Sequence, residues 1–103
     1  MARSYSEDFL LDLHKLDPKR LGVQLAKLCV EANLPALYVA KAFKVSRMTV
    51  HSWFRGQYIR DKNCKRIEIF MDLVRQGLDQ GHLPASNLKK AREYIEINIT
   101  DSI

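Results

Sequence analysis

The stretch PALYVAKAFKVSRMTVHSWFRG, residues 35–56, predicts two short helices joined by a tight turn. Pro35 suits a helix start, because its ring presets the backbone angle that a first turn needs. The first helix is expected to run to about residue 43, since apolar side chains recur there at helical spacing. Lys44 and Val45 form the turn. The residues expected to face inward from the first helix are Val39, Ala40 and Phe43.

The second helix of the pair is expected over residues 47–55. Ser46 is a favoured N-cap, because its hydroxyl can accept a hydrogen bond from a free N–H of the first turn. Gly56 is placed to end the helix. The residues expected on or near its apolar face are Val50, Trp53 and Phe54. The opposite face is polar, so this pair of helices has one side for a core and one side for a partner.

Helices are also expected before this pair, over residues 6–16 and 18–32. Ser4 and Ser6 precede two acidic residues and favour the start of the first helix. The second contains Gly22, which weakens a helix and is explained if a neighbour packs closely there. The signals that bound this second helix are Asp17, Pro18 and Asn33.

After the pair, a loop is expected over residues 56–63, followed by a helix over 62–76 that Gly77 ends. Residues 79–86 form a second loop, and Ser86 is expected to cap a last helix that carries Leu88, Ala91 and Ile95. The fold class is therefore all-α, a small bundle of five to six helices.

The C-terminal tail has two interpretations. Ile95, Ile97 and Ile99 alternate with polar residues, which is the period of a strand and not of a helix. A short C-terminal strand is therefore included in the expected fold. Segment 87–99 either pairs as strands across a two-fold axis or closes the core of its own chain.

Composition and length favour a single ordinary domain. The chain has 103 residues, of which 47% are hydrophobic and 28% charged. Cys29 and Cys64 lack metal-ligand spacing and are expected to be free thiols. The N-terminus lacks a signal-peptide pattern, and no apolar run approaches the length of a membrane span, so we expect a cytoplasmic protein.

Positive charge is concentrated in the middle of the chain. The whole chain carries +5, yet residues 41–66 hold eight basic residues and one acid, Asp61, for a net +7. The rest of the chain is therefore at −2. A block of one sign suits a polyanionic partner. The eight basic residues are Lys41, Lys44, Arg47, Arg55, Arg60, Lys62, Lys65 and Arg66.

Enzyme activity is not expected. The sequence has no glycine-rich phosphate loop, no Ser/His/Asp spacing of a nucleophilic site and no pair of carboxylates at a plausible cleft. No cofactor, metal ion or small-molecule ligand is expected either.

The two-helix stretch resembles the helix-turn-helix of the lambda Cro/repressor-like (XRE) family, closely over residues 36–55 and in helix order over 18–76. Ala40 stands where that family has a small residue at the helix crossing. Two positions depart from the pattern, because Lys44 replaces the usual Gly of the turn and Ala36 replaces a frequent Gln. The positions that match the family's apolar support are Val39, Phe43, Val45, Val50 and Trp53.

This resemblance implies one helix-turn-helix domain over residues 1–103, with an N-terminal helix in 1–17, a core bundle in 18–83 and a C-terminal helix and tail in 84–103. It also implies a repressor-like transcriptional regulator of bacterial or phage origin that binds double-stranded DNA as a dimer. In such proteins the second helix enters the major groove, where base edges differ in their hydrogen-bonding pattern.

The outward residues of the second helix are expected to contact bases, and the neighbouring basic and polar residues to contact phosphates. The expected base-contacting residues are Arg47, Met48, Thr49, His51 and Ser52. The expected phosphate-contacting residues are Lys41, Lys44, Arg55, Gln57, Tyr58, Arg60, Lys62 and Lys65.

The alternative function is a protein-interaction module, such as an antitoxin or a phage protein that binds a host enzyme. A protein-binding face is typically apolar with Tyr, Trp or Arg anchors and few lysines. The surface expected here is basic and polar, which favours DNA.

Overall fold

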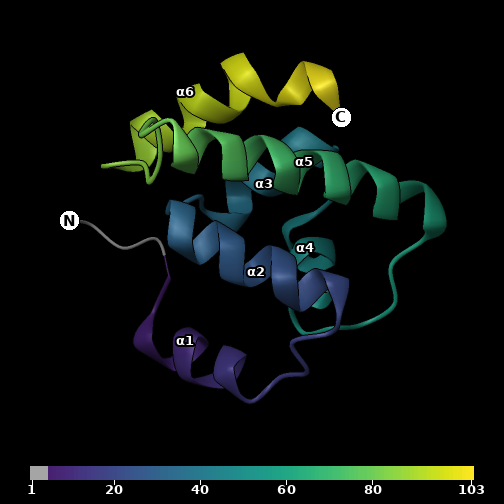
Figure 1. Cartoon of the computed structure of the whole chain (residues 1–103). Coiled ribbons are helices and arrows are strands. Elements are labelled where there is room, and N and C mark those ends of the chain that lie inside the picture. The colour runs from purple at the N-terminus through teal and green to yellow at the C-terminus, as the bar shows by residue number, and fades with distance from the viewer. Residues whose placement is uncertain (1–4) are drawn as a thin grey trace.

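The computed structural model describes residues 5–103, and every regular element in this part of the chain is helical (Figure 1). The expected all-α fold class is confirmed. The helices are α1 (Glu7–His14), α2 (Leu21–Ala32), α3 (Ala36–Phe43), α4 (Arg47–Phe54), α5 (Asp61–Asp79) and α6 (Leu88–Asn98), followed by the short 3-10 helix η1 (Thr100–Ser102).

Helix α2 lies at the centre of the molecule. It packs against α4 on one side and α5 on the other, while α6 covers α3 and α1 lies at the opposite end (Figure 1). Aromatic rings join the layers, because the ring of Phe43 lies 5.4 Å from Trp53 and 5.2 Å from Phe70, measured between centroids. These contacts hold α3, α4 and α5 in one core, which leaves the far side of α4 exposed.

The predicted helix signals on either side of the central pair are largely confirmed. The Ser6 hydroxyl accepts a hydrogen bond from the Phe9 N–H and caps α1. Asn33 ends α2 in the left-handed conformation, at φ 56°. Ser4 lies outside the described residues.

Gly22 is buried against α4, as its unfavourable place in a helix suggested. A Cβ atom built on Gly22 would collide with the backbone carbonyl of Trp53. Only a glycine lets the two backbones approach so closely, and this approach fixes where the last turn of α4 lies relative to α2.

Two helix starts differ from the prediction. Helix α2 begins at Leu21 and not at residue 18, because the Asp17 carboxylate accepts from the Lys19 N–H and holds residues 17–20 in a turn. Helix α6 is capped by Asn87 and not by Ser86. The Asn87 side-chain carbonyl accepts a hydrogen bond from the Lys90 N–H, which is one of the free backbone donors in the first turn of α6.

Helix α5 is longer than predicted at both ends. It begins at Asp61, one residue before the expected start at 62. Gly77 does not end it, and the helix continues to Asp79. Gly77 is buried in the last turn, where the Tyr94 hydroxyl occupies the space that a Cβ would need. This glycine therefore leaves space for the tip of the Tyr94 side chain.

The predicted C-terminal strand is wrong. Residues 88–98 are helical, because Ala91, Ile95 and Ile99 lie at four-residue spacing and all are buried against the core. Ile97, which made the pattern look like a strand, is 77% exposed. Pairing of this segment as strands is therefore excluded, and the helix closes the core of its own chain.

In residues 5–103, no helix combines the length and the apolar character needed to cross a membrane.

Candidate nucleic-acid interface

Helices α3 and α4 form the expected pair, joined by a turn at Lys44 and Val45. Lys44 lies in the left-handed region, at φ 59°, although it is not a glycine. Its N–H donates to the Lys41 carbonyl and the Val45 N–H donates to the Ala40 carbonyl, which closes the end of α3. Lys44 therefore adopts the left-handed conformation that a glycine usually adopts at the end of a helix, at a cost of about 1 kcal/mol in backbone strain.

The second helix begins at Arg47 as predicted and ends at Phe54, one residue before the expected end at 55. The Ser46 hydroxyl accepts from the Thr49 N–H at 3.1 Å. At the other end Gly56 adopts φ 82°, and its N–H donates to the Trp53 carbonyl. Both ends of α4 are thus closed by local hydrogen bonds, and packing of its buried face sets its orientation in the fold.

The buried face of α4 consists of Val50, Trp53 and Phe54. At 100° per residue, the middle of the opposite face falls on Met48, Ser52 and Arg55. Met48 is 81% exposed, so its flexible apolar side chain is accessible to a partner at the middle of this face. An exposed Met at the centre of this face indicates a contact surface.

Two hydroxyls expected to contact bases are already engaged within the protein. The Thr49 hydroxyl lies 2.9 Å from that of Ser46, within the cap of α4. The Ser52 hydroxyl donates to the side-chain carbonyl of Gln57 at 2.5 Å. Each hydroxyl would therefore have to share or give up its internal hydrogen bond in order to contact a base.

His51 lies one helical turn after Arg47, on the flank of α4 that faces α1 rather than on the face centred on Met48 and Ser52. Its ring packs edge-on against Phe9 of α1, at 6.4 Å between centroids, and against Phe54, at 5.9 Å. Burial, and then the nearby positive charges of Arg47 and Arg55, lower the pKa of His51 below its usual value. Helix α1 was not expected to reach α4, because no local pattern encodes that contact.

A groove of about 660 Å³ runs between α4, the loop that follows it and the first turn of α5. Its floor is formed by core residues such as Phe43 and Trp53. Seven of the predicted site residues meet in this groove: Lys44, Met48, Thr49, Ser52, Tyr58, Arg60 and Lys62. Tyr58 is 80% exposed, so the groove presents two large exposed side chains, Met48 and Tyr58, among its positive charges.

The remaining predicted residues lie around this groove and not in it. Lys41 lies on α3, with its ammonium 5.7 Å from the ring of Tyr38, and Lys65 is exposed on α5. Arg55 lines a smaller cavity on the α1 side, together with Asp12 and His51. Arg47 is exposed at the first turn of α4.

Arg66 is a structural residue that the sequence did not distinguish from its basic neighbours. Its guanidinium donates to the Phe43 carbonyl and to the Asn63 side chain, both at 3.2 Å, and lies 5.2 Å from the centre of the Phe43 ring. Arg66 therefore ties α5 to the end of α3. The spacing of Asn63 and Arg66 was the only local signal for it.

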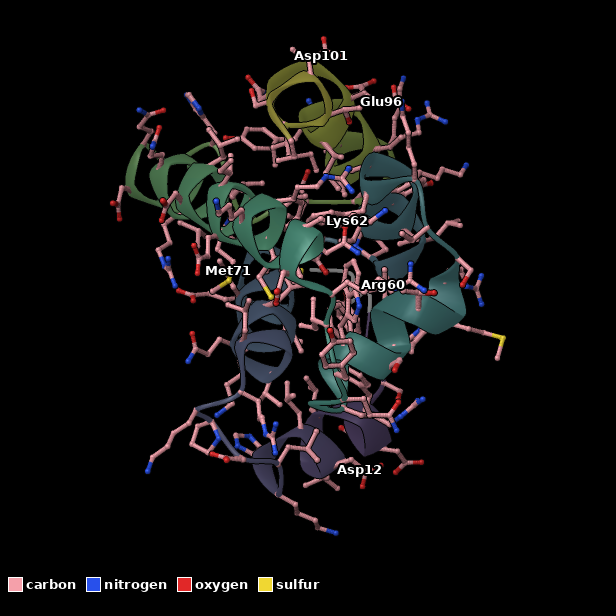
Figure 2. The ribbon with its side chains drawn as sticks, turned by 90° about the vertical axis from the view of Figure 1, so that its right-hand side faces the viewer. Asp12, Arg60, Lys62, Met71, Glu96 and Asp101 are labelled. Carbon is pink, nitrogen blue, oxygen red and sulfur yellow. The ribbon has the colours of Figure 1, made fainter. Side chains whose placement is uncertain are left out.

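Within residues 5–103 the one ion pair joins Arg75 and Asp72 on α5, far along the helix from the groove. The cations of the basic block thus have no carboxylate within ion-pair distance among the described residues. Figure 2 shows Arg60 and Lys62 between Asp12, at the α1 end, and Glu96 and Asp101, at the α6 end. The two labelled cations thus lie between labelled carboxylates at either end of the view.

Comparison of the chain with protein-family models, with curated proteins and with solved structures finds no match. The resemblance to the lambda Cro/repressor-like family therefore stays a prediction that depends on residues 36–55.

Proposed function

We propose that this chain is a sequence-specific transcriptional regulator that binds double-stranded DNA and places α4 in the major groove. The observation that carries this proposal is the exposed face of α4, centred on Met48 and bordered by unpaired cations. An α-helix fits the major groove, and neighbouring lysines and arginines neutralise the phosphates on either side.

The geometry supports distinct roles for the residues of this surface. Arg47 is exposed on the first turn of α4, which enters the groove first, and its guanidinium can donate two hydrogen bonds to guanine. Met48 offers an apolar contact for a thymine methyl group. His51 is omitted from the base-contacting set, because its ring faces α1. Phosphate contacts are proposed for Lys41, Lys44, Arg55, Tyr58, Arg60, Lys62 and Lys65.

A homodimer on a palindromic site completes this proposal, with half-sites about one helical turn apart. Helix α6 offers a surface for it, since Leu88 is 56% and Ile97 77% exposed although the opposite face of the helix is buried. The protein would act in the cytoplasm of a bacterium or of a phage-infected cell.

The test is a selection from a random duplex library with the wild type and with Arg47→Ala. The wild type should recover a palindromic motif. Arg47→Ala should lose about 1–3 kcal/mol of affinity for that motif, since a bidentate base contact is removed, and should keep its affinity for random duplex. Arg75→Ala, an equal change on the exposed side of α5, away from both the groove and α6, is the matched control.

If Arg47→Ala weakens binding to specific and random duplexes equally, Arg47 contacts a phosphate. If the wild type binds tightly without a motif, the protein recognises DNA shape alone. Either result refutes base recognition by the first turn of α4.

A protein-interaction module is the second candidate, and one observation favours it. Met48 and Tyr58 are both exposed along one groove, and Met, Tyr and Arg are enriched at the centres of protein interfaces. Absence of DNA binding at moderate salt in the selection above would favour this second candidate.

A further inference from the structure

We propose that Gln57 is a base-contacting residue whose side-chain amide, oriented by Ser52, selects guanine in the recognition sequence. The resemblance had placed Gln57 among the phosphate ligands. This inference rests on the proposed DNA-binding function and names a base that the same surface would select.

The backbone of Gln57 is held on the last turn of α4. Its N–H donates to the Ser52 carbonyl at 3.2 Å, and the preceding Gly56 N–H donates to the Trp53 carbonyl at 2.8 Å. These two bonds form the usual glycine-dependent closure of a helix end. Gln57 is therefore an extension of α4 and moves with it, although it lies beyond the helix.

The side chain of Gln57 returns to the same residue. The Ser52 hydroxyl donates to the Gln57 Oε1 atom at 2.5 Å. Ser52 follows Met48 by one helical turn, so both lie on the outward face of α4. Gln57 itself also lines a small cavity beside the start of α2, and the hydrogen bond to Ser52 brings its amide to the edge of the face that would enter the major groove.

The orientation of the amide determines what it can recognise. A free glutamine pairs with adenine, because it can donate to N7 and accept from the N6 amino group at once. In this protein Oε1 is engaged by Ser52, so the part of the amide left for a base is the NH₂, which only donates. The major-groove edge of guanine offers two acceptors, N7 and O6, and no donor. The Ser52 hydroxyl thus shifts the preference of Gln57 from adenine to guanine.

Other residues are better placed to bind phosphates. Lys44, Arg60 and Lys62 line the groove beside α4, and none of them has an acidic partner among the described residues. A neutral amide adds little to such a set, because charged donors bind phosphate about twice as strongly. The Gln57 amide, held against Ser52 at the end of this face, is instead suited to a base edge.

The experiment compares the motifs that the wild type, Gln57→Ala, Ser52→Ala and Gln57→Glu select from a random duplex library, followed by titration of single-base variants of the motif. Gln57→Ala should lose the preference for guanine at one position of each half-site. Discrimination of guanine against adenine there should fall by about tenfold, the change expected for a base contact, while binding to random duplex stays within about twofold.

The other two variants test the orientation of the amide. Ser52→Ala frees Oε1, so the same position should then accept adenine. Gln57→Glu replaces the two donors by acceptors and should change the preference from guanine to cytosine, whose N4 amino group is a donor. Gln76→Ala, an equal truncation on the exposed side of α5, is the control and should select the wild-type motif.

Equal loss of affinity on all duplexes in Gln57→Ala, with an unchanged motif, would show a phosphate contact and overturn the inference. An unchanged guanine preference in Ser52→Ala would also overturn it, since the hydroxyl would then not orient the amide. In both cases the wild type still selects a motif, so the proposed function stands. A wild type that selects no motif would overturn both.

Discussion

Substitution of Gly22 by alanine should destabilise the protein, although alanine is the better helix former. The change alone favours α2 by about 1 kcal/mol. This gain is opposed by a collision, because the new Cβ would overlap the carbonyl group of Trp53 and lie 3.1 Å from its Cα atom. These are backbone atoms, so no side-chain rotation relieves the contact, and α2 must move away from α4.

The magnitude follows from what that movement disturbs. Overpacking a core costs about 1–3 kcal/mol and more where the neighbour is rigid. The Trp53 carbonyl also accepts from the Gly56 N–H, so moving it strains the end of α4. With the helix gain subtracted, we expect a net loss of about 2 kcal/mol of unfolding free energy. For a domain of this size that lowers Tm by about 8–16 °C.

The assay is thermal and urea unfolding followed by circular dichroism, with Gly77→Ala as the matched control. Gly77 is also a buried helical glycine, but a Cβ there would meet the ends of the Tyr94 and Leu83 side chains, which can rotate. Gly77→Ala should therefore keep or slightly raise Tm. If Gly22→Ala melts at or above the wild-type temperature, the two backbones are not in close contact and the reasoning is refuted.

Two further predictions concern α4 and its turn. Lys44→Gly should raise the unfolding free energy by about 1 kcal/mol, because glycine accepts the left-handed backbone at φ 59° without strain. The same change should reduce the salt dependence of DNA binding by about one counterion. A rise in stability with unchanged salt dependence would show that Lys44 does not contact a phosphate. The lowered pKa of His51 means that the unfolded chain takes up its proton first as pH falls, so the stability this residue contributes is complete above about pH 6.5 and is lost as pH falls through the folded pKa. Tm should therefore fall more in the wild type than in His51→Gln between about pH 7.5 and pH 5, and equal falls would show that the histidine is not desolvated by α1.

The central pair of helices was predictable because its signals are local. Ser46 and Gly56 satisfy hydrogen bonds within a few residues of themselves, and the apolar period of 36–55 needs only one helix to be recognised. The same is true of Asn33 at the end of α2. The left-handed Lys44 was predictable only as an alternative, since the sequence lacks the glycine that usually marks such a turn.

The errors lie where a distant residue decides. Gly77 looked like a helix stop, but Tyr94 makes it a packing position. The isoleucines near the C-terminus looked like a strand, but the core behind α6 buries only Ile95 and Ile99. His51 was expected to face outward, but its ring packs against Phe9 of α1.

By itself, the sequence determined the helical class, most helix boundaries near the central turn and the position of the positive block. These depend on interactions over four residues or fewer, which a single chain segment displays. The tertiary structure decided which flank of α4 is covered by α1, that Arg66 ties α5 to α3, and which site residues share one groove. Those features depend on contacts between segments tens of residues apart, whose free energy exists only after the core has brought the helices together.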